Sequence, residues 1–360
     1  MSSTLLSHER RIAELAVQRA SVLTKKVLRG VNQGALSKSD SSPVTIADFA
    51  AQALLISALH AAFPSDTFVG EEDADVIRQD EQLRSRIWEL VSTTHLDDVE
   101  SEALLWSPAS VDEMLAVIDL GGRGTGGREG RVWMLDPVDG TATFLKGHQY
   151  AVSLALVEDG QELIGVLGCP NLTLSAGRIK EEVVDDEGYG IMLSAVKGHG
   201  AVQRPMGTGS LQPSQPIPAS STGPAETKEL HLVDYSLSDR WRRDLVRELS
   251  AQLGAAYPAS DLWSSHMRYA ALILNAADVQ VRIPPSRAKN SCVWDHAGAQ
   301  LIYREVGGRI TDLDGGDMDF GAGRKLDNWG VVAAKEDVHA GVLEAVKDVL
   351  RRDVEREERQ

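Results

Sequence analysis

Two aspartates, three residues apart, stand at the end of an apolar run and offer the clearest chemistry in the sequence. They are Asp136 and Asp139. Pro137 fixes φ and donates no N–H, and Gly140 permits a tight turn, so both carboxylates should lie on one rigid bend with the Val138 carbonyl between them. Three hard oxygens that converge suit Mg²⁺. An Asp-rich surface turn gives the same pattern, so the pair alone leaves both interpretations open.

Two further acidic strings occur in contexts that favour a site. Residues 67–73, TFVGEED, form a short apolar strand that runs directly into carboxylates. Residues 293–298, VWDHAG, place Asp295 where a helix should begin. The ends of strands and the starts of helices are where side chains are held for chemistry. These elements are therefore expected to position the acidic groups.

The strings GEED, DPVDGT and WDHAG, in this order and at these separations, resemble the metal-dependent, lithium-sensitive phosphatase superfamily that contains inositol monophosphatases and 3′(2′),5′-bisphosphate nucleotidases. The similarity runs from about Ser42 to Ala334. It implies an α+β / α/β chain with the sugar-phosphatase (inositol monophosphatase-like) fold, a layered αβαβα sandwich. It also implies removal of the 3′-phosphate from adenosine 3′,5′-bisphosphate, with 3′-phosphoadenylyl sulfate as a second candidate substrate, and a place in sulfate assimilation and salt tolerance.

The resemblance assigns the metal ligands by position. The ligands are Glu71, Asp136, Asp139, Asp295 and the Val138 carbonyl. Together they would hold two or three Mg²⁺ ions, with Asp136 bridging the ions. Two such ions, roughly 3.5–4 Å apart, would stabilise both the attacking and the leaving oxygen of a phosphate ester.

The same resemblance assigns the catalytic pair. Thr141 matches the family threonine whose hydroxyl orients the attacking water, and it is counted with the substrate-binding residues as well. Asp48, in the string VTIADFAAQ, matches its acidic partner. From the residues alone, Asp48 in the first turn of a helix over 47–63 would only complement the helix dipole.

Substrate binding is assigned to the stretch SSHMRY and the strand after it. There the resemblance implies that Ser265, Arg268 and Arg282 hold the nucleotide phosphate that is not hydrolysed. An arginine on a helix is otherwise a solvated charge.

The chain departs from the nucleotidase pattern at two places. Where those enzymes commonly have a histidine after the strand that opens the second domain, this chain has Asp234-Tyr235-Ser236. After DPVDGT it reads Ala142-Thr143-Phe144 in place of Lys-Gly-Phe. An inositol monophosphate or inositol polyphosphate phosphatase with the same metal site is therefore the alternative enzyme. A catalytically silent nucleotide sensor is the alternative outside enzymes.

Composition limits the partners. The formal charge of −16 argues against nucleic acid and acidic membranes, which a basic surface would attract. The two cysteines give neither a disulfide framework nor zinc-ligand spacing, and no apolar stretch approaches 18 uninterrupted residues. We expect a cytoplasmic protein whose partner is a small phosphorylated nucleotide, with no obligate protein partner evident.

The pattern along the chain predicts two domains. Residues 1–205 should form an α+β domain whose hairpins make an antiparallel sheet, residues 206–228 a linker or loop rich in Pro, Ser and Gly, residues 229–350 an α/β domain, and residues 351–360 a frayed charged tail. Residues 121–130 contain six glycines. They lack G-K-[ST] and precede a strand, so they are expected to be a flexible loop and not a phosphate-binding loop.

Overall fold

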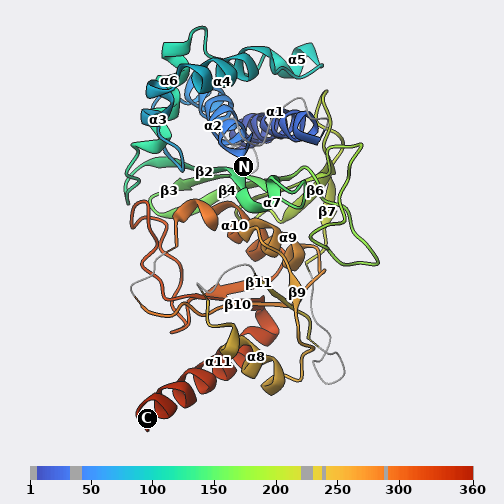
Figure 1. Cartoon of the computed structure of the whole chain (residues 1–360), viewed down its shortest axis with the longest axis vertical. Coiled ribbons are helices and arrows are strands. Elements are labelled where there is room, and N and C mark those ends of the chain that lie inside the picture. The colour runs from blue at the N-terminus through green and yellow to red at the C-terminus, as the bar shows by residue number, and fades with distance from the viewer. Residues whose placement is uncertain (1–5, 33–42, 220–229, 237–240, 288–290, 360) are drawn as a thin grey trace.

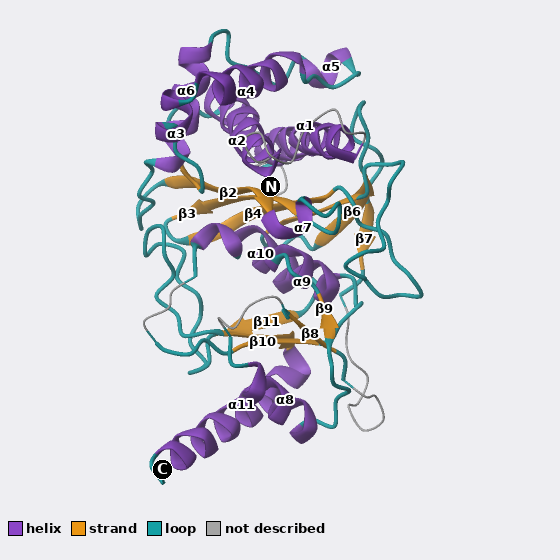
Figure 2. Cartoon of the chain, viewed as in Figure 1, coloured by secondary structure: helices purple, strands orange, loops and turns teal. Residues whose placement is uncertain are grey.

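The computed structural model describes residues 6–32, 43–219, 230–236, 241–287 and 291–359. Its elements stack in five layers, helix, sheet, helix, sheet, helix, along the long axis of the molecule (Figures 1 and 2). The layered sandwich predicted from the resemblance is confirmed. The N-terminal part of the chain supplies one outer helix layer and the first sheet, and the C-terminal part supplies the middle helices, the second sheet and the other outer helix layer.

In the described residues the first sheet has seven strands in sequence order. Its only parallel pair joins the first two strands, and the rest of the pairs are antiparallel, as the hairpin pattern predicted. The strands are β1 (Thr67–Gly70), β2 (Arg131–Asp139), β3 (Ala151–Glu158), β4 (Gln161–Cys169), β5 (Ile191–Val196), β6 (Ala201–Pro205) and β7 (Gln215–Ile217).

Helices cover both faces of this sheet, which explains why its strands read as continuous apolar runs. On β2, Trp133 and Leu135 pack toward the N-terminal helices, whereas Val132 and Met134 pack toward the C-terminal half. The N-terminal helices are α1 (Ser7–Asn32), α2 (Pro43–Ala62), α3 (Asp75–Gln79), α4 (Glu81–Thr93), α5 (Val99–Glu102) and α6 (Val111–Gly122).

The second sheet has five strands in the order β11-β12-β10-β8-β9 within the described chain. They are β8 (Leu232–Asp234), β9 (Ser260–Asp261), β10 (Val279–Arg282), β11 (Gly308–Thr311) and β12 (Val331–Lys335). The helices α9 (Ser265–Ile273) and α10 (Ala297–Glu305) lie between the two sheets, and α8 (Arg243–Gln252) and α11 (Glu336–Glu357) cover the outer face (Figure 2). Two short helices complete the set, α7 (Thr141–Phe144) and the 3₁₀ turn η2 (Val293–Asp295).

Several local predictions need correction. Part of the stretch predicted to be a linker, 206–228, forms β7, because Gln215 to Ile217 pairs with the edge of β6. The tail predicted to fray remains helical to Glu357, since α11 continues through it. Asp48 lies beyond the first turn of α2, because that helix already begins at Pro43. Asp295 ends the turn η2 and does not open a helix.

Helix α2 is long and apolar enough to cross a membrane by length and composition. In the fold, however, 83% of its apolar window is buried inside the protein. Its low amphipathicity has the same origin, because α1, α4, α6 and the first sheet surround it. We therefore interpret α2 as the central helix of the N-terminal core.

Candidate metal and phosphate site

The parallel pairing of β1 and β2 brings two acidic strings together. Gly70 lies opposite Leu135, so Glu71, directly after β1, and Asp136, near the end of β2, lie at the same edge of the sheet. Beyond Asp136 the pairing with β3 shifts register, and Asp139 is the next paired residue. Such irregularities re-aim side chains next to active sites. The sheet edge therefore presents the carboxylates predicted from the sequence.

Gly140 forms the turn that follows. Its φ is +108°, and a Cβ there would lie 2.5 Å from the Thr143 hydroxyl oxygen. Only glycine fits this position, because both the backbone angle and the space exclude a side chain. Thr141 then opens α7 and is exposed, while Thr143 is buried and donates to the Gly140 carbonyl at 2.6 Å. The predicted catalytic hydroxyl is thus accessible from outside.

Helix α2 supplies the remaining acidic group. Asp48 is 5% exposed, and its Oδ1 has no hydrogen-bond partner in the described part of the protein. Burial raises the pKa of Asp48 well above its usual range, and the charges of Glu72 and Glu71 raise it further. No hydrogen bond joins Asp48 to Thr141 among the described residues, so the structure leaves their predicted cooperation as a prediction.

One turn along α2, Gln52 fixes the acidic loop. Its amide nitrogen donates to the Glu72 carbonyl at 2.6 Å and to the Ile118 carbonyl at 2.9 Å. Its amide oxygen accepts from the Glu72 N–H at 3.1 Å. Residues four apart share a helix face, so Asp48 and Gln52 point the same way. No role for Gln52 was predicted from the sequence, although its spacing of four residues from Asp48 is the signal that could have indicated one.

The carboxylates repel one another. Burial raises the pKa of Asp136 well above its usual range, and the charges of Glu71, Asp139 and Asp295 add to the shift. Enclosure by the protein, followed by Glu72 and Asp295, raises the pKa of Glu71 to about 8. Burial and then Asp139 raise the pKa of Asp295 to about 6. An uncompensated group of this kind takes up protons or cations.

The donor set suits a hard divalent cation. Asp136 is 2% exposed, and its Oδ1 has no hydrogen-bond partner among the residues described. Buried carboxylate oxygens without donors are what Mg²⁺ coordination would satisfy. Over the same residues, no three His, Cys, Asp or Glu side chains already converge as the ligands of one ion. The acidic side chains therefore lie in the same region of the protein, but they do not converge on one position.

Asp139 connects this region to the C-terminal half. Its Oδ2 accepts from the Ser264 hydroxyl and from the His266 N–H, both at 2.6 Å. Ser264 is the N-cap of α9 and accepts from the Met267 N–H. A carboxylate at a helix N-terminus is favoured by the helix dipole. The DPVDGT turn is thereby docked on the helix that carries the predicted phosphate-binding residues.

The structure brings the three predicted phosphate-binding residues together. The Ser265 hydroxyl oxygen accepts from Arg268 at 2.9 Å and from Arg282 at 3.3 Å. Arg268 is 1% exposed and also donates to the carbonyls of Leu262 and Trp263. Its guanidinium is therefore largely committed to its own helix start.

Arg282 is held less completely. Its guanidinium carbon lies 3.8 Å from the centre of the Trp241 ring. Its Nε is buried with no hydrogen-bond partner in the described chain. Burial, followed by the charge of Arg268, lowers the pKa of Arg282 to about 9. A buried guanidinium with a free N–H is suited to a phosphate oxygen, which would satisfy both its charge and its donor.

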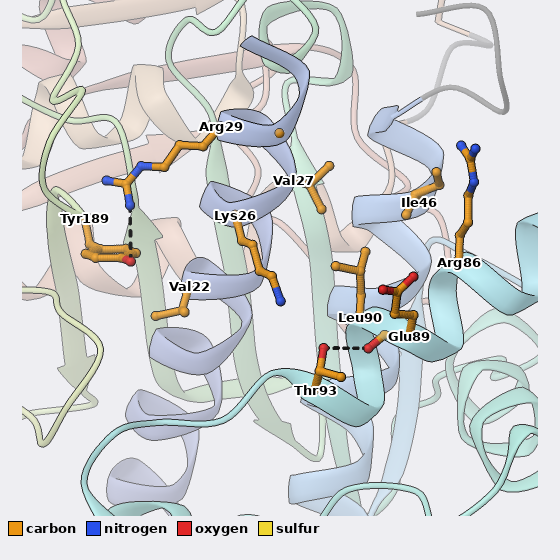
Figure 3. Close-up of a pocket in the computed structure, with 11 residues that line it drawn as sticks. Val22, Lys26, Val27, Arg29, Ile46, Arg86, Glu89, Leu90, Thr93 and Tyr189 are labelled. Atoms are coloured by element: carbon orange, nitrogen blue, oxygen red, sulfur yellow. Dashed lines mark hydrogen bonds between the residues drawn. The ribbon is translucent and has the colours of Figure 1, made fainter. Parts of the chain in front are cut away.

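A cavity of about 620 Å³ lies elsewhere. It is lined by residues of α1, α2 and α4 and by Tyr189 (Figure 3). Its α2 residue is Ile46, two positions before Asp48. Side chains two apart on a helix project to nearly opposite sides, so this cavity does not open toward the acidic residues.

Known proteins are similar to this chain over nearly its whole length. The model of the inositol monophosphatase family matches residues 6–351. Proteins named 3′(2′),5′-bisphosphate nucleotidase are similar over almost the whole chain. The one from Emericella nidulans is 42% identical (95% of this chain, 98% of that protein), the one from Schizosaccharomyces pombe 38% (96% of each), and the one from Oryza sativa 35% (94% and 93%).

Solved structures show the same fold at lower identity. An inositol monophosphatase from Staphylococcus aureus has a TM-score of 0.58 at 16% identity and covers 95% of each chain. SuhB of Mycobacterium tuberculosis has a TM-score of 0.56 at 19% identity, covering 95% of this chain and 96% of that one. These neighbours support the layered architecture and leave the substrate to the closer sequence relatives.

Proposed function

The chain belongs to the inositol monophosphatase family, and from that membership we propose that it is a Mg²⁺-dependent 3′(2′),5′-bisphosphate nucleotidase. It would hydrolyse adenosine 3′,5′-bisphosphate to AMP and phosphate and would also act on 3′-phosphoadenylyl sulfate. One observation supports this most directly. Asp139, one of the mutually repelling carboxylates, accepts hydrogen bonds at the start of α9, next to the buried arginines that donate to Ser265. The protein therefore offers a place for cations beside a place for an anion.

The residues proposed to hold two or three Mg²⁺ ions are Glu71, Asp136, Asp139, Asp295 and the Val138 carbonyl. When bound, the ions would neutralise the carboxylates, lower the pKa of a water and stabilise the charge of the phosphate. The orphaned Oδ1 of Asp136 and the mutual repulsion around it support this assignment.

Proton transfer is proposed for Asp48 and Thr141. The Thr141 hydroxyl would accept from the attacking water and donate to Asp48, whose free Oδ1 would take the proton. The raised pKa of Asp48 favours it as an acceptor, because a carboxylate buried beside other acids holds a proton readily. Asp48 is close enough to the carboxylates for Glu72 and Glu71 to raise its pKa, and Thr141 follows Asp139 by two residues.

The 5′-phosphate is proposed to lie on Arg282, with Ser265 and Arg268 orienting that side chain. A protein of charge −16 repels a bisphosphate at long range, so buried guanidinium groups must supply the local attraction. The two halves of the chain would then act as two functional domains, one for the metals and one for the remote phosphate.

The test is a kinetic comparison of adenosine 3′,5′-bisphosphate with inositol 1-phosphate, each with and without Mg²⁺. We expect the nucleotide to be preferred by at least about tenfold in kcat/KM, since only its second phosphate engages Arg282. A preference for inositol phosphates would support the alternative phosphatase. Absence of turnover on every substrate would support a nucleotide sensor.

Lithium sensitivity, a cytoplasmic location and roles in sulfate assimilation and salt tolerance belong to the same proposal. Li⁺ should inhibit in an uncompetitive or mixed manner, by displacing one weakly held Mg²⁺ after hydrolysis. Rates measured over a range of Li⁺ and substrate concentrations test this. An Mg²⁺-supported rate unaffected by high Li⁺ would contradict it.

A further inference from the structure

Arg324 spans the two halves of the chain beside the proposed metal site. It lies between β11 and β12, and its Nη2 donates to the Gly70 carbonyl at 2.7 Å. Its Nη1 donates to the carbonyls of Gly121 at 3.0 Å and Gly124 at 2.9 Å. Its guanidinium carbon lies 4.7 Å from the centre of the Trp294 ring.

The neighbours of these contacts are the proposed ligands. Gly70 immediately precedes Glu71, and Trp294 immediately precedes Asp295. We propose that Arg324 is a positioning residue that sets the separation of Glu71 and Asp295 across the two halves, and so tunes the affinity of the metal site. This inference rests on the proposed function, because it needs those two residues to share bound Mg²⁺.

The backbone around Arg324 is hydrogen-bonded to the segment that leads into η2, which carries Asp295. The Arg324 carbonyl accepts from the Val293 N–H at 3.1 Å, and the Leu326 N–H donates to the Ser291 carbonyl at 2.9 Å. A displacement of Arg324 is therefore transmitted to η2, where Asp295 lies. On the other side, the two Nη atoms donate hydrogen bonds to carbonyls at the end of β1 and around the end of α6.

The glycine-rich run acquires a role from this contact. A Cβ on Gly124 would lie 1.7 Å from the Phe68 carbonyl oxygen, and one on Gly126 would lie 3.3 Å from Gly323. Gly323 itself has φ +116°, and a Cβ there would lie 3.2 Å from the Thr125 carbonyl oxygen. Gly124 thus packs against β1, whereas Gly126 and Gly323 let their two backbones approach closely. The loop predicted to be flexible therefore docks against residues 319–324 through Thr125, Gly126 and Arg128.

Arginine suits this position better than lysine. A planar guanidinium presents several N–H groups in a fixed fork and also stacks on an aromatic ring, whereas an ammonium is a point donor. Here the fork reaches carbonyls on two separate segments while its face rests on Trp294. A lysine could satisfy one segment but not hold both at a set distance.

The variants that test this are Arg324→Met and Arg324→Lys, with Arg128→Met as the control. Arg128 pairs with Asp319 across the same interface, but within the described residues it makes no hydrogen bond or ion pair with Gly70 or Trp294. Mg²⁺ binding to the full chain is measured by calorimetry and by the Mg²⁺-dependent rise in Tm. The Mg²⁺ concentration for half-maximal turnover of adenosine 3′,5′-bisphosphate is measured in parallel.

We expect Arg324→Met to weaken Mg²⁺ binding by about 10- to 100-fold, the range typical of residues that orient metal ligands, and Arg324→Lys to recover part of it. Arg128→Met should stay within about twofold of the parent, because it changes the interface and not the ligand spacing. If Arg324→Met does not fold, Arg324→Lys replaces it in the same titration, where it should still bind Mg²⁺ more weakly than the parent.

Two outcomes overturn the inference while the proposed function stands. Either the Arg324 variants bind Mg²⁺ like the parent, or Arg128→Met loses as much affinity as they do, which would make the whole interface responsible. If the parent protein neither binds Mg²⁺ nor hydrolyses the bisphosphate, the proposed function fails and this inference fails with it.

Discussion

The carboxylates of the N-terminal half and the guanidinium groups of the C-terminal half are both buried, yet they are held in opposite ways. Asp136 and Asp48 each keep an oxygen without a donor in the described protein. Arg268, by contrast, donates to two carbonyls and a hydroxyl. The cationic part is thus organised largely by hydrogen bonds within the protein, although the buried Nε atoms of Arg268 and Arg282 lack a partner among the described residues, whereas the anionic part is incomplete without cations. Substrate recognition and metal binding should therefore respond differently to mutation.

Asp136→Asn and Asp139→Asn give the largest expected effect. Each should lower kcat by roughly a thousandfold or more, because a neutral amide coordinates Mg²⁺ poorly and several kcal/mol of charge stabilisation are lost. Activity is measured at saturating Mg²⁺. Near-parental turnover of either variant would refute the assignment of the DPVDGT turn.

Stability without metal separates the two variants. Asp136→Asn removes a buried repelling charge and should leave the free energy of unfolding unchanged or higher by about 1 kcal/mol. Asp139→Asn weakens the acceptor for Ser264 and the His266 N–H and should lower it by about 1 kcal/mol. Urea unfolding in a chelator measures both, and a lower stability for Asp136→Asn would show that its charge is already compensated.

The next effect tests the cationic part. Arg282→Ala should reduce kcat/KM for adenosine 3′,5′-bisphosphate by roughly ten- to a hundredfold, since a charge-assisted hydrogen bond is worth about 1.5–3 kcal/mol. Adenosine 3′-monophosphate, which lacks the remote phosphate, should lose far less.

Arg268→Ala is the matched comparison for that experiment. Because Arg268 is committed to the start of α9, its loss should lower stability and affect both substrates together. Equal losses on both substrates for Arg282→Ala would place that arginine in folding or at the reacting phosphate instead.

Glu162 is a buried acid with an ion-pair partner, so it lies between the unpaired carboxylates and the hydrogen-bonded arginines. Glu162 pairs with Arg304, and burial still raises the pKa of Glu162 to about 7. Its folded pKa exceeds the unfolded value near 4.3, so its contribution to stability is complete below that value and is lost as pH rises toward 7.

Glu162→Gln should remove this pH dependence. The stability of the parent relative to the variant should fall by about 1–3 kcal/mol between pH 4.5 and pH 8 in urea unfolding. The same change at Glu158, which is only half-buried on the same hairpin, is the matched control. A relative stability that rises with pH would mean that Arg304 outweighs burial.

The acidic strings could be predicted from the sequence because each is local. Apolar runs that lead into Gly-Glu or Asp-Pro can be recognised within a few residues. The structure places Glu71 directly after β1 and Asp136 near the end of β2, the strand that pairs with β1. Three motifs in order were enough to predict the fold.

Residues that act across the fold escaped the sequence for the opposite reason. Arg324 lies 200 positions along the chain from Gly124 and 203 positions from Gly121, yet it contacts both. The register of α2 also misled the placement of Asp48, because the buried stretch from Pro43 extends the helix before the expected cap. Spacing along the chain carries no signal for contacts that only the layered stacking creates.

The smallest expected effect concerns Trp241, which covers Arg282. A cation–π contact of this kind is worth about 0.5–2 kcal/mol, so Trp241→Leu should raise KM for adenosine 3′,5′-bisphosphate by about threefold to tenfold through looser placement of the guanidinium. Trp241→Phe should recover most of the loss, and kcat should change little, because the metal ligands are not touched. Adenosine 3′-monophosphate should respond to neither variant. If Trp241→Leu lowered kcat with KM unchanged, Arg282 would contribute to the reacting phosphate, and the division into a metal-binding half and a phosphate-binding half would be wrong.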